Sequence, residues 1–149
     1  MRVFVTGASG FIGSAVVPEL LQAGHQVVGL ARSDASARAI AAAGAEVLRG
    51  SLDDLDSLRV GAEKSDGVIH LAFVHEFVAD FSRYEAAART DTRAVETLGA
   101  ALEGSGRPLV IASGLLGVAP GRLAVETDVP AAMMRGLSEE AVRALATRG

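Results

Sequence analysis

Short apolar runs alternate with longer stretches of helical periodicity along this chain of 149 residues. Five runs lack polar alternation, which is typical of strands buried on both faces of a sheet. They are Arg2–Thr6, Gln26–Ala31, Glu46–Arg49, Gly67–Ala72 and Leu109–Ala112. Between them, apolar side chains recur at helical spacing. The alternation predicts an α/β fold in which helices cover both faces of a parallel sheet.

Helices are expected between and after these strands, with Asp34 and Ser138 as N-terminal caps and with Gly24, Gly44 and Gly104 at helix ends. They are expected over Gly10–Ala23, from a cap at Asp34 to Gly44, as a single turn at Asp54–Leu58, over Phe77–Leu102, and from a cap at Ser138 to Thr147. Right-handed crossovers between five such strands give a doubly wound sheet with the strand order 3-2-1-4-5.

The helix expected over Phe77–Leu102 carries an informative pattern. Its apolar positions are spaced alternately four and three residues apart, so they fall on one face. Asp91 is the only charged residue on that face. A lone carboxylate among apolar side chains has two interpretations: a polar role in a site, or a buried group bonded to the backbone.

Composition narrows the class of protein. Apolar residues make up 50% of the chain and charged residues 21%, which suits one globular domain over residues 1–149. A net charge of −4 lacks the excess of positive charge typical of proteins that bind nucleic acid. No apolar stretch approaches the ~20 residues that span a membrane. The absence of cysteine excludes disulfides and thiolate metal sites, no metal-ligand spacing is present, and a cytoplasmic location is the default.

A glycine-rich turn, TGASGFIG over Thr6–Gly13, joins the first strand directly to the first helix. Gly7 permits the tight turn, Gly10 lets the backbone approach a pyrophosphate, and Gly13 lets the helix pack close to the sheet. The helix N-terminus adds free N–H groups and a positive dipole. In this context the turn predicts dinucleotide binding, with a tight turn that holds no ligand as the alternative.

The end of the second strand predicts which dinucleotide is bound. An acidic residue there would hold the ribose 2′-hydroxyl of NAD, whereas an arginine accommodates the 2′-phosphate of NADP. Arg32 and Ser33 occupy this place and offer a bidentate clamp and a hydroxyl donor. The alternative is a solvated Arg32 with Asp34 on the ribose. The pattern favours NADP, with NAD as the alternative.

These motifs resemble the extended or atypical short-chain dehydrogenases/reductases, also called the NAD-dependent epimerase/dehydratase family. The matching segments are Thr6–Gly13 (TGASGFIG), Gly50–Leu52 (GSL), Asp66–Ala72 (DGVIHLA), the long helix and Val110–Gly114 (VIASG). The resemblance covers essentially the whole chain and implies a Rossmann fold. Family members continue with further strands and a substrate region, so this chain resembles their N-terminal cofactor half.

The resemblance also implies roles for eight residues along the cofactor. These are Ser9, Phe11 and Ile12 at the pyrophosphate, Ser51 and Leu52 at the adenine, and Leu71, Ala72 and Phe73 at the central riboses. The family usually has aspartate at the position of Ser51, so the adenine contact is weaker or water-mediated here.

The catalytic Tyr-x-x-x-Lys pair of the family is missing. Arg135 stands at the position of the tyrosine and Glu139 at that of the lysine. Tyr84 and Lys64 are the only tyrosine and the only lysine of the chain, and neither has the required spacing.

Three other residues are candidates for catalysis. Ser113 would polarise a substrate carbonyl, unless that position belongs to Leu115. His75 follows the fourth strand and is either a proton donor or a solvated loop histidine. Asp91 falls where the family usually has an active-site asparagine. His70, inside the fourth strand, is interpreted as part of the core.

The resemblance implies an NADP-dependent oxidoreductase of atypical type, acting on a small carbonyl or nucleotide-sugar-like substrate. The alternative is a non-catalytic NADP-binding sensor or an inactive fragment, because the catalytic pair is absent. We also expect a homodimer, through the open edge of Leu109–Ala112 or through small residues on the long helix. Those residues are Ala86, Ala87, Ala94 and Ala101. A monomer in which residues 113–135 cover the edge is the alternative.

Overall fold

The computed structural model describes residues 1–75, 80–114, 118–128 and 136–148. At its centre lies a parallel sheet of five strands. They are β1 (Arg2–Thr6), β2 (Gln26–Ala31), β3 (Glu46–Arg49), β4 (Gly67–His70) and β5 (Leu109–Ile111). The strand order is β3-β2-β1-β4-β5, and every neighbouring pair is parallel. The predicted fold class and strand order are confirmed.

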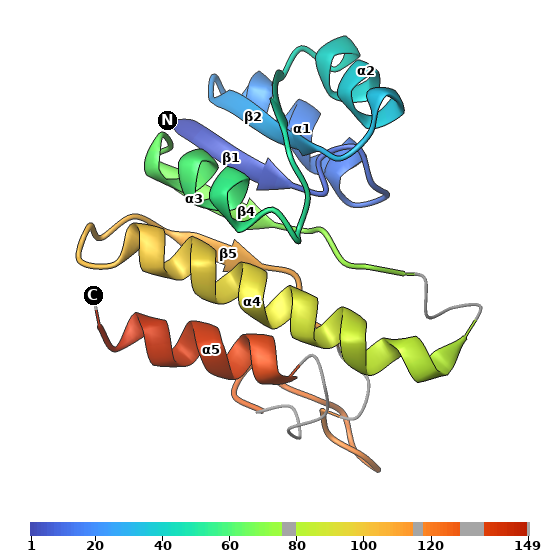
Figure 1. The fold of residues 1–149 in the computed structure, drawn as a ribbon. Coiled ribbons are helices and arrows are strands. Elements are labelled where there is room, and N and C mark those ends of the chain that lie inside the picture. The colour runs from blue at the N-terminus through green and yellow to red at the C-terminus, as the bar shows by residue number, and fades with distance from the viewer. Residues whose placement is uncertain (76–79, 115–117, 129–135, 149) are drawn as a thin grey trace.

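Helices cover both faces of this sheet (Figure 1). They are α1 (Gly13–Gln22), α2 (Asp34–Ala42), α3 (Leu55–Glu63), α4 (Tyr84–Leu102) and α5 (Gly136–Ala146), with a short 3-10 helix η2 (Phe81–Arg83) before α4. One buried cluster joins the sheet to α1 and α2, and the other joins it to α3 and α4. Within the described ranges, no helix is long and apolar enough to cross a membrane.

Strand β1 lies at the middle of the sheet and is buried on both sides. Phe4 packs into the cluster with α3 and α4, whereas Val3 and Val5 pack into the cluster with α1 and α2. Alternate side chains of a strand point to opposite faces, so a strand between two helical layers has apolar residues in succession, as at Val3, Phe4 and Val5.

Several element boundaries differ from the predicted ones. The first helix begins at Gly13 rather than Gly10, because residues 10–12 form the turn from the strand. Instead of a single turn, α3 extends to Glu63, and the Asp54 side chain caps it by accepting from the Ser57 amide at 3.2 Å. Strands β4 and β5 end before the residues predicted, at His70 and Ile111.

Helix α4 begins at Tyr84, whereas the sequence pattern placed its start at Phe77, which lies outside the described residues. Before it, η2 leaves Phe81 70% exposed, with its ring stacked on that of Tyr84 at 5.4 Å. The remainder of the predicted face is buried. Its buried members are Ala88, Asp91, Val95, Leu98 and Leu102.

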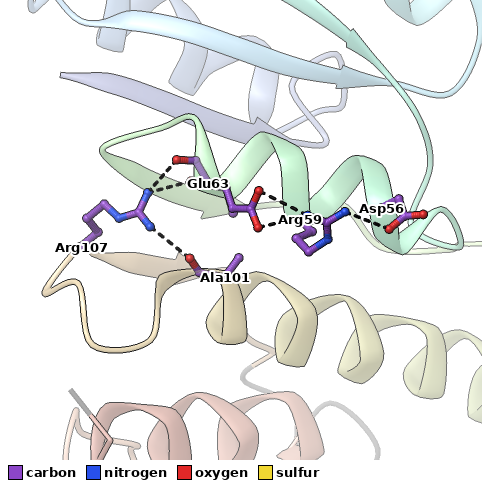
Figure 2. Close-up of polar contacts among 6 residues, drawn as sticks. Asp56, Arg59, Glu63, Ala101 and Arg107 are labelled. Atoms are coloured by element: carbon purple, nitrogen blue, oxygen red, sulfur yellow. Dashed lines mark hydrogen bonds and ion pairs between the residues drawn. The ribbon is translucent and has the colours of Figure 1, made fainter.

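Arg107 joins the C-terminal ends of α3 and α4 (Figure 2). Its guanidinium donates to four backbone carbonyls, those of Ala62, Glu63, Ser65 and Ala101, at 2.7–3.2 Å. Carbonyls in the last turn of a helix have no partner within the helix, and a cation there also interacts favourably with the helix dipole. One side chain therefore satisfies the ends of two helices.

Helix α5 lies beside α4 (Figure 1). Gly99 permits the close approach, because a Cβ atom there would lie 2.1 Å from a methyl group of Leu145. The start of α5 differs from the prediction. Ser138 does not cap the helix but lies inside it, since α5 begins at Gly136, and its hydroxyl donates to the buried Asp91.

Candidate functional site

A cleft of about 650 Å³ opens where β1, β2, β3 and β4 end. Ligands of doubly wound sheets bind outside the carboxyl ends of the strands, at such a position. All thirteen residues assigned to the cofactor from the sequence line the cleft. They are Gly7, Ser9, Gly10, Phe11, Ile12, Gly13, Arg32, Ser33, Ser51, Leu52, Leu71, Ala72 and Phe73. The fold thus brings together segments that are up to 66 positions apart.

Five further lining residues were missed from the sequence. They are Leu30, Ser36, Gly50, Asp53 and Val74. Four of these directly adjoin a predicted lining residue or are separated from one by a single position, so extending each motif would have found them. Ser36 is different, because it reaches the cleft through the first turn of α2.

Close contacts in the turn explain why glycine occupies three of its positions. Gly7 has a positive φ of 69°, and a Cβ atom there would lie 2.7 Å from the Ala72 nitrogen. A Cβ atom on Gly13 would lie 2.2 Å from the Gly7 carbonyl oxygen, so Gly13 serves the turn itself rather than only the packing of helix on sheet. At Gly10 a Cβ atom would approach only that same oxygen, at 3.1 Å. Gly10 therefore leaves space on the side of the cleft.

The N-terminus of α1 points a positive dipole end at the cleft, where Gly13 is a lining residue. No side chain caps this helix, and its first turn contains no acidic residue. Phe11 is 98% exposed in the adjoining turn. The first turn of α1 therefore places no negative charge at this helix end, which suits an anionic ligand.

At the end of β2, Arg32 is exposed and lines the cleft. Its side chain forms no hydrogen bond or ion pair with another residue in the described part of the chain. Ser33, predicted as a donor to phosphate, caps α2: its hydroxyl accepts from the Ser36 amide at 3.2 Å. The cap is therefore Ser33 and not Asp34, which is the first residue of the helix.

Asp34 was the alternative ligand for the ribose. Its carboxylate forms an ion pair with Arg49, from the end of β3, and it does not line the cleft. The structure therefore separates the two candidates: the arginine faces the cleft, and the aspartate is paired beside it.

His75 lies at the cleft, four residues beyond the predicted ribose contact Leu71. Its Nδ1 donates to the Phe73 carbonyl at 2.9 Å, and its ring contacts that of Phe73 edge-on at 5.5 Å. These contacts orient the imidazole, and the hydrogen bond to the carbonyl requires a proton on Nδ1.

Ser113 follows β5 and donates its hydroxyl hydrogen to Glu139, in the first turn of α5. The residue at the position of the family's lysine thus contacts the candidate for its serine. Neither side chain lines the cleft. Leu115, the alternative for the serine position, and Arg135 lie outside the described residues.

Asp91 belongs to a buried polar chain that links four elements. Thr6 Oγ1 contacts His70 Nδ1 at 2.7 Å, and His70 Nε2 contacts Asp91 Oδ1 at 3.1 Å. The Ser138 hydroxyl donates to Asp91 Oδ2 at 2.6 Å. Each of these residues is at most 2% exposed, which confirms the interpretation of His70 as a core residue.

This polar chain changes the interpretation of Asp91. Its oxygens accept from side chains rather than from backbone amides, and it does not line the cleft. At the other end, the Ala72 amide donates to Thr6 Oγ1 at 3.3 Å. The chain of contacts therefore runs from the lining of the cleft to α5. A catalytic role for Asp91 stays a prediction.

The family model for the "NAD dependent epimerase/dehydratase family" matches residues 3–120. The chain belongs to this family. An uncharacterized protein of Schizosaccharomyces pombe is 52% identical over 113 residues, which are 76% of this chain and 37% of that protein. One of Saccharomyces cerevisiae is 48% identical over 130 residues, 86% of this chain and 42% of that protein. The chain thus spans about two fifths of the length of these relatives.

Among solved structures, MoeE5 in complex with UDP-glucose and NAD is similar over the whole of this chain. The TM-score is 0.80 and the identity 27%, and the match covers 50% of the MoeE5 chain. The family match and this likeness support a nicotinamide dinucleotide as the cofactor of the cleft.

Proposed function

We propose that the cleft binds NADP(H), and that this chain provides the cofactor half of an oxidoreductase. The observation that carries the proposal is the arrangement at the end of β2. Arg32 faces the cleft without a partner among the described residues, whereas Asp34 is paired with Arg49. The relative MoeE5 was solved with NAD, so the preference for NADP rests on this end of the cleft alone.

The lining of the cleft fits such a ligand. The turn from Gly7 to Gly13 and the uncapped N-terminus of α1 would hold the pyrophosphate. Ser51 and Leu52 would lie beside the adenine, and the segment from Leu71 to Phe73 would lie along the riboses. A bound nicotinamide would supply or accept a hydride, and the substrate would be a small carbonyl or nucleotide-sugar-like compound.

At the substrate end, we assign proton handling to His75 and Ser113. The imidazole of His75, which lines the cleft, would carry a proton to or from the substrate. Ser113 would donate its hydroxyl hydrogen to a substrate oxygen in place of Glu139, which accepts that hydrogen in this structure. Asp91 would act indirectly, through its contacts with His70 and α5.

The alternative is a non-catalytic module that binds NADP and senses it. The missing Tyr-x-x-x-Lys pair favours this alternative, because general acid–base catalysis raises a reaction rate by roughly 10²–10⁴-fold and the pair would supply it. A carbonyl panel with NADPH separates the two. Turnover that disappears in His75→Ala, with NADPH binding retained, supports the oxidoreductase; tight binding without turnover supports the module.

Calorimetric titration of NADPH and NADH tests the choice of cofactor. We expect NADPH to bind more tightly than NADH. Arg32→Ala should lower the affinity for NADPH about tenfold and leave the affinity for NADH unchanged. A charged hydrogen bond contributes roughly 1.5–3 kcal/mol when buried and less when exposed. Arg38→Ala is the matched control, because Arg38 is exposed on α2 and does not line the cleft. Equal affinities for the two cofactors would reject the NADP preference.

We also propose self-association as a dimer through β5, which lies at one end of the sheet order and exposes 54% of Val110. Contact through α4 has less support, because Ala87 and Ala94 are buried within the chain itself. Sedimentation velocity at micromolar concentration tests this proposal, and a concentration-independent monomer would reject it. A cytoplasmic location stays a prediction.

A further inference from the structure

Three charged side chains gather where β2 and β3 end side by side. Ala31 and Arg49 are partners in the register of these strands, so Arg49 lies next to the start of the β2–α2 turn. Its Nη1 donates to the Ser33 carbonyl at 2.7 Å, and its Nη2 pairs with the Asp34 carboxylate. Arg32 belongs to the same turn but faces the cleft.

The two arginines have different surroundings. Arg32 lines the cleft, whereas Arg49 does not, and both terminal nitrogens of Arg49 are engaged by the β2–α2 turn. A phosphate in the cleft would therefore meet the guanidinium of Arg32. Arg49 pairs instead with the carboxylate of Asp34, which lies two residues after Arg32.

That carboxylate matters for the choice of cofactor. An acidic side chain at the end of the second strand of such a fold binds a ribose 2′-hydroxyl and disfavours a 2′-phosphate. Charges interact over about 8–10 Å at ordinary ionic strength, so Asp34 would act on a phosphate at Arg32 without touching it. An ion pair with Arg49 cancels most of that effect.

We propose that Arg49 is a specificity-determining residue that favours NADP by neutralising Asp34, without contacting the 2′-phosphate. The inference rests on the proposed binding of NADP(H) in the cleft. With the pair intact, the three side chains carry a net charge of +1. Loss of Arg49 alone lowers this charge to zero, and loss of both partners restores it to +1. The double variant is therefore the decisive one.

The experiment compares wild type, Arg49→Gln, Asp34→Asn and the double variant by titration with NADPH and NADH at about 50 mM salt, where surface charges are incompletely screened. We expect Arg49→Gln to lower the affinity for NADPH roughly 3- to 10-fold and to leave the affinity for NADH unchanged or higher. Asp34→Asn should bind NADPH at least as tightly as wild type. In the double variant, NADPH affinity should return to within about twofold of wild type.

Arg59→Gln is the matched control, because Arg59 also forms exposed ion pairs but lies on α3 and does not line the cleft. A double variant as weak for NADPH as Arg49→Gln would overturn the inference, since Arg49 would then contact the phosphate itself. Equal loss of both cofactors in Arg49→Gln would also overturn it, because Arg49 would then only hold the turn. Failure of the proposed function is distinct: wild type would bind neither cofactor, or would prefer NADH.

Discussion

All strands of the sheet begin at one edge and end at the opposite edge. Each of these two edges holds an arginine, and the two arginines differ in their hydrogen-bond partners. At the edge where the strands begin, Arg107 donates to four carbonyls at the ends of α3 and α4, and Figure 2 shows its contacts with Glu63 and Ala101. At the edge where the strands end, Arg32 lines a cleft and has no partner within the described ranges. At the edge where the strands begin, the donors of the arginine are paired within the protein. At the edge where the strands end, donors remain available to a ligand.

The same contrast holds for the helix ends at the two edges. The C-termini of α3 and α4 receive a cation from the chain, whereas the N-terminus of α1 receives neither a capping side chain nor an acidic residue. Each edge presents helix ends of one sign because the helices run antiparallel to the strands. Arg107 offsets the negative ends of α3 and α4, whereas the positive end of α1 faces the cleft, which suits the binding of a phosphate group.

The largest effect on stability is expected at the buried polar chain that supports the cleft. Asp91→Ala should lower the free energy of unfolding by roughly 2–5 kcal/mol, because His70 Nε2 and the Ser138 hydroxyl would each lose a buried partner. Urea denaturation measures the change. Asp91→Asn is the control: its amide can accept from His70 and donate to Ser138, so it should lose less than half as much. Equal losses for the two variants would show that charge, rather than hydrogen bonding, holds the chain of contacts together.

At the structural edge, Arg107→Met should lower the free energy of unfolding by about 1.5–3 kcal/mol, since a half-buried charged donor is lost from two helix ends. NADPH binding should not change, because Arg107 lies at the opposite edge from the cleft. Thermal denaturation and a single titration measure both quantities. A weakened affinity with unchanged stability would contradict the division between the two edges.

At the cleft edge, Gly10→Ala should show the reverse behaviour. The added methyl group would approach only the Gly7 carbonyl, at 3.1 Å, so we expect a small loss of stability. It would occupy the space where the backbone approaches the pyrophosphate, and NADPH affinity should fall about tenfold or more. Calorimetry and denaturation of the same sample check the pair of outcomes. An unaltered affinity would place the pyrophosphate elsewhere.

The smallest effect is expected at exposed ion pairs. Arg59 pairs with Asp56 and Glu63 on the surface of α3 (Figure 2). Arg59→Ala should cost less than about 1 kcal/mol of stability, and the cost should shrink as salt is added. Urea denaturation at two salt concentrations tests both statements. A loss as large as that of Arg107→Met would remove the distinction between exposed and half-buried arginines.

Local patterns in the sequence predicted the sheet and most of the cleft. Buried strands are apolar throughout, and the turn from Thr6 to Gly13 needs glycine for steric reasons, so both leave strong signals. The length of α3 was missed, because its exposed face is polar and only Asp54–Leu58 was expected to form a helical turn. Gly61 is in fact required by the Phe4 ring, which lies 2.5 Å from where a Cβ atom would be.

Contacts between distant segments could not be predicted from the sequence. Ser138 looked like a helix cap, but its hydroxyl serves Asp91, 47 positions away. Arg49 carried no motif, and its role depends on the register that places it beside the turn after Ala31. Both are polar side chains whose partners are set by packing of separate elements, which periodicity and spacing do not encode.

The claim that one edge binds the cofactor and the other is structural is tested most directly by amide chemical shifts of the isotopically labelled chain during titration with NADPH. We expect shifts along the glycine turn, at Arg32 and Ser51, and along the segment from Leu71 to Phe73. Signals around Arg107 and at the C-terminal ends of α3 and α4 should not change. Shifts concentrated around Arg107, or none in the glycine turn at saturating NADPH, would contradict the claim.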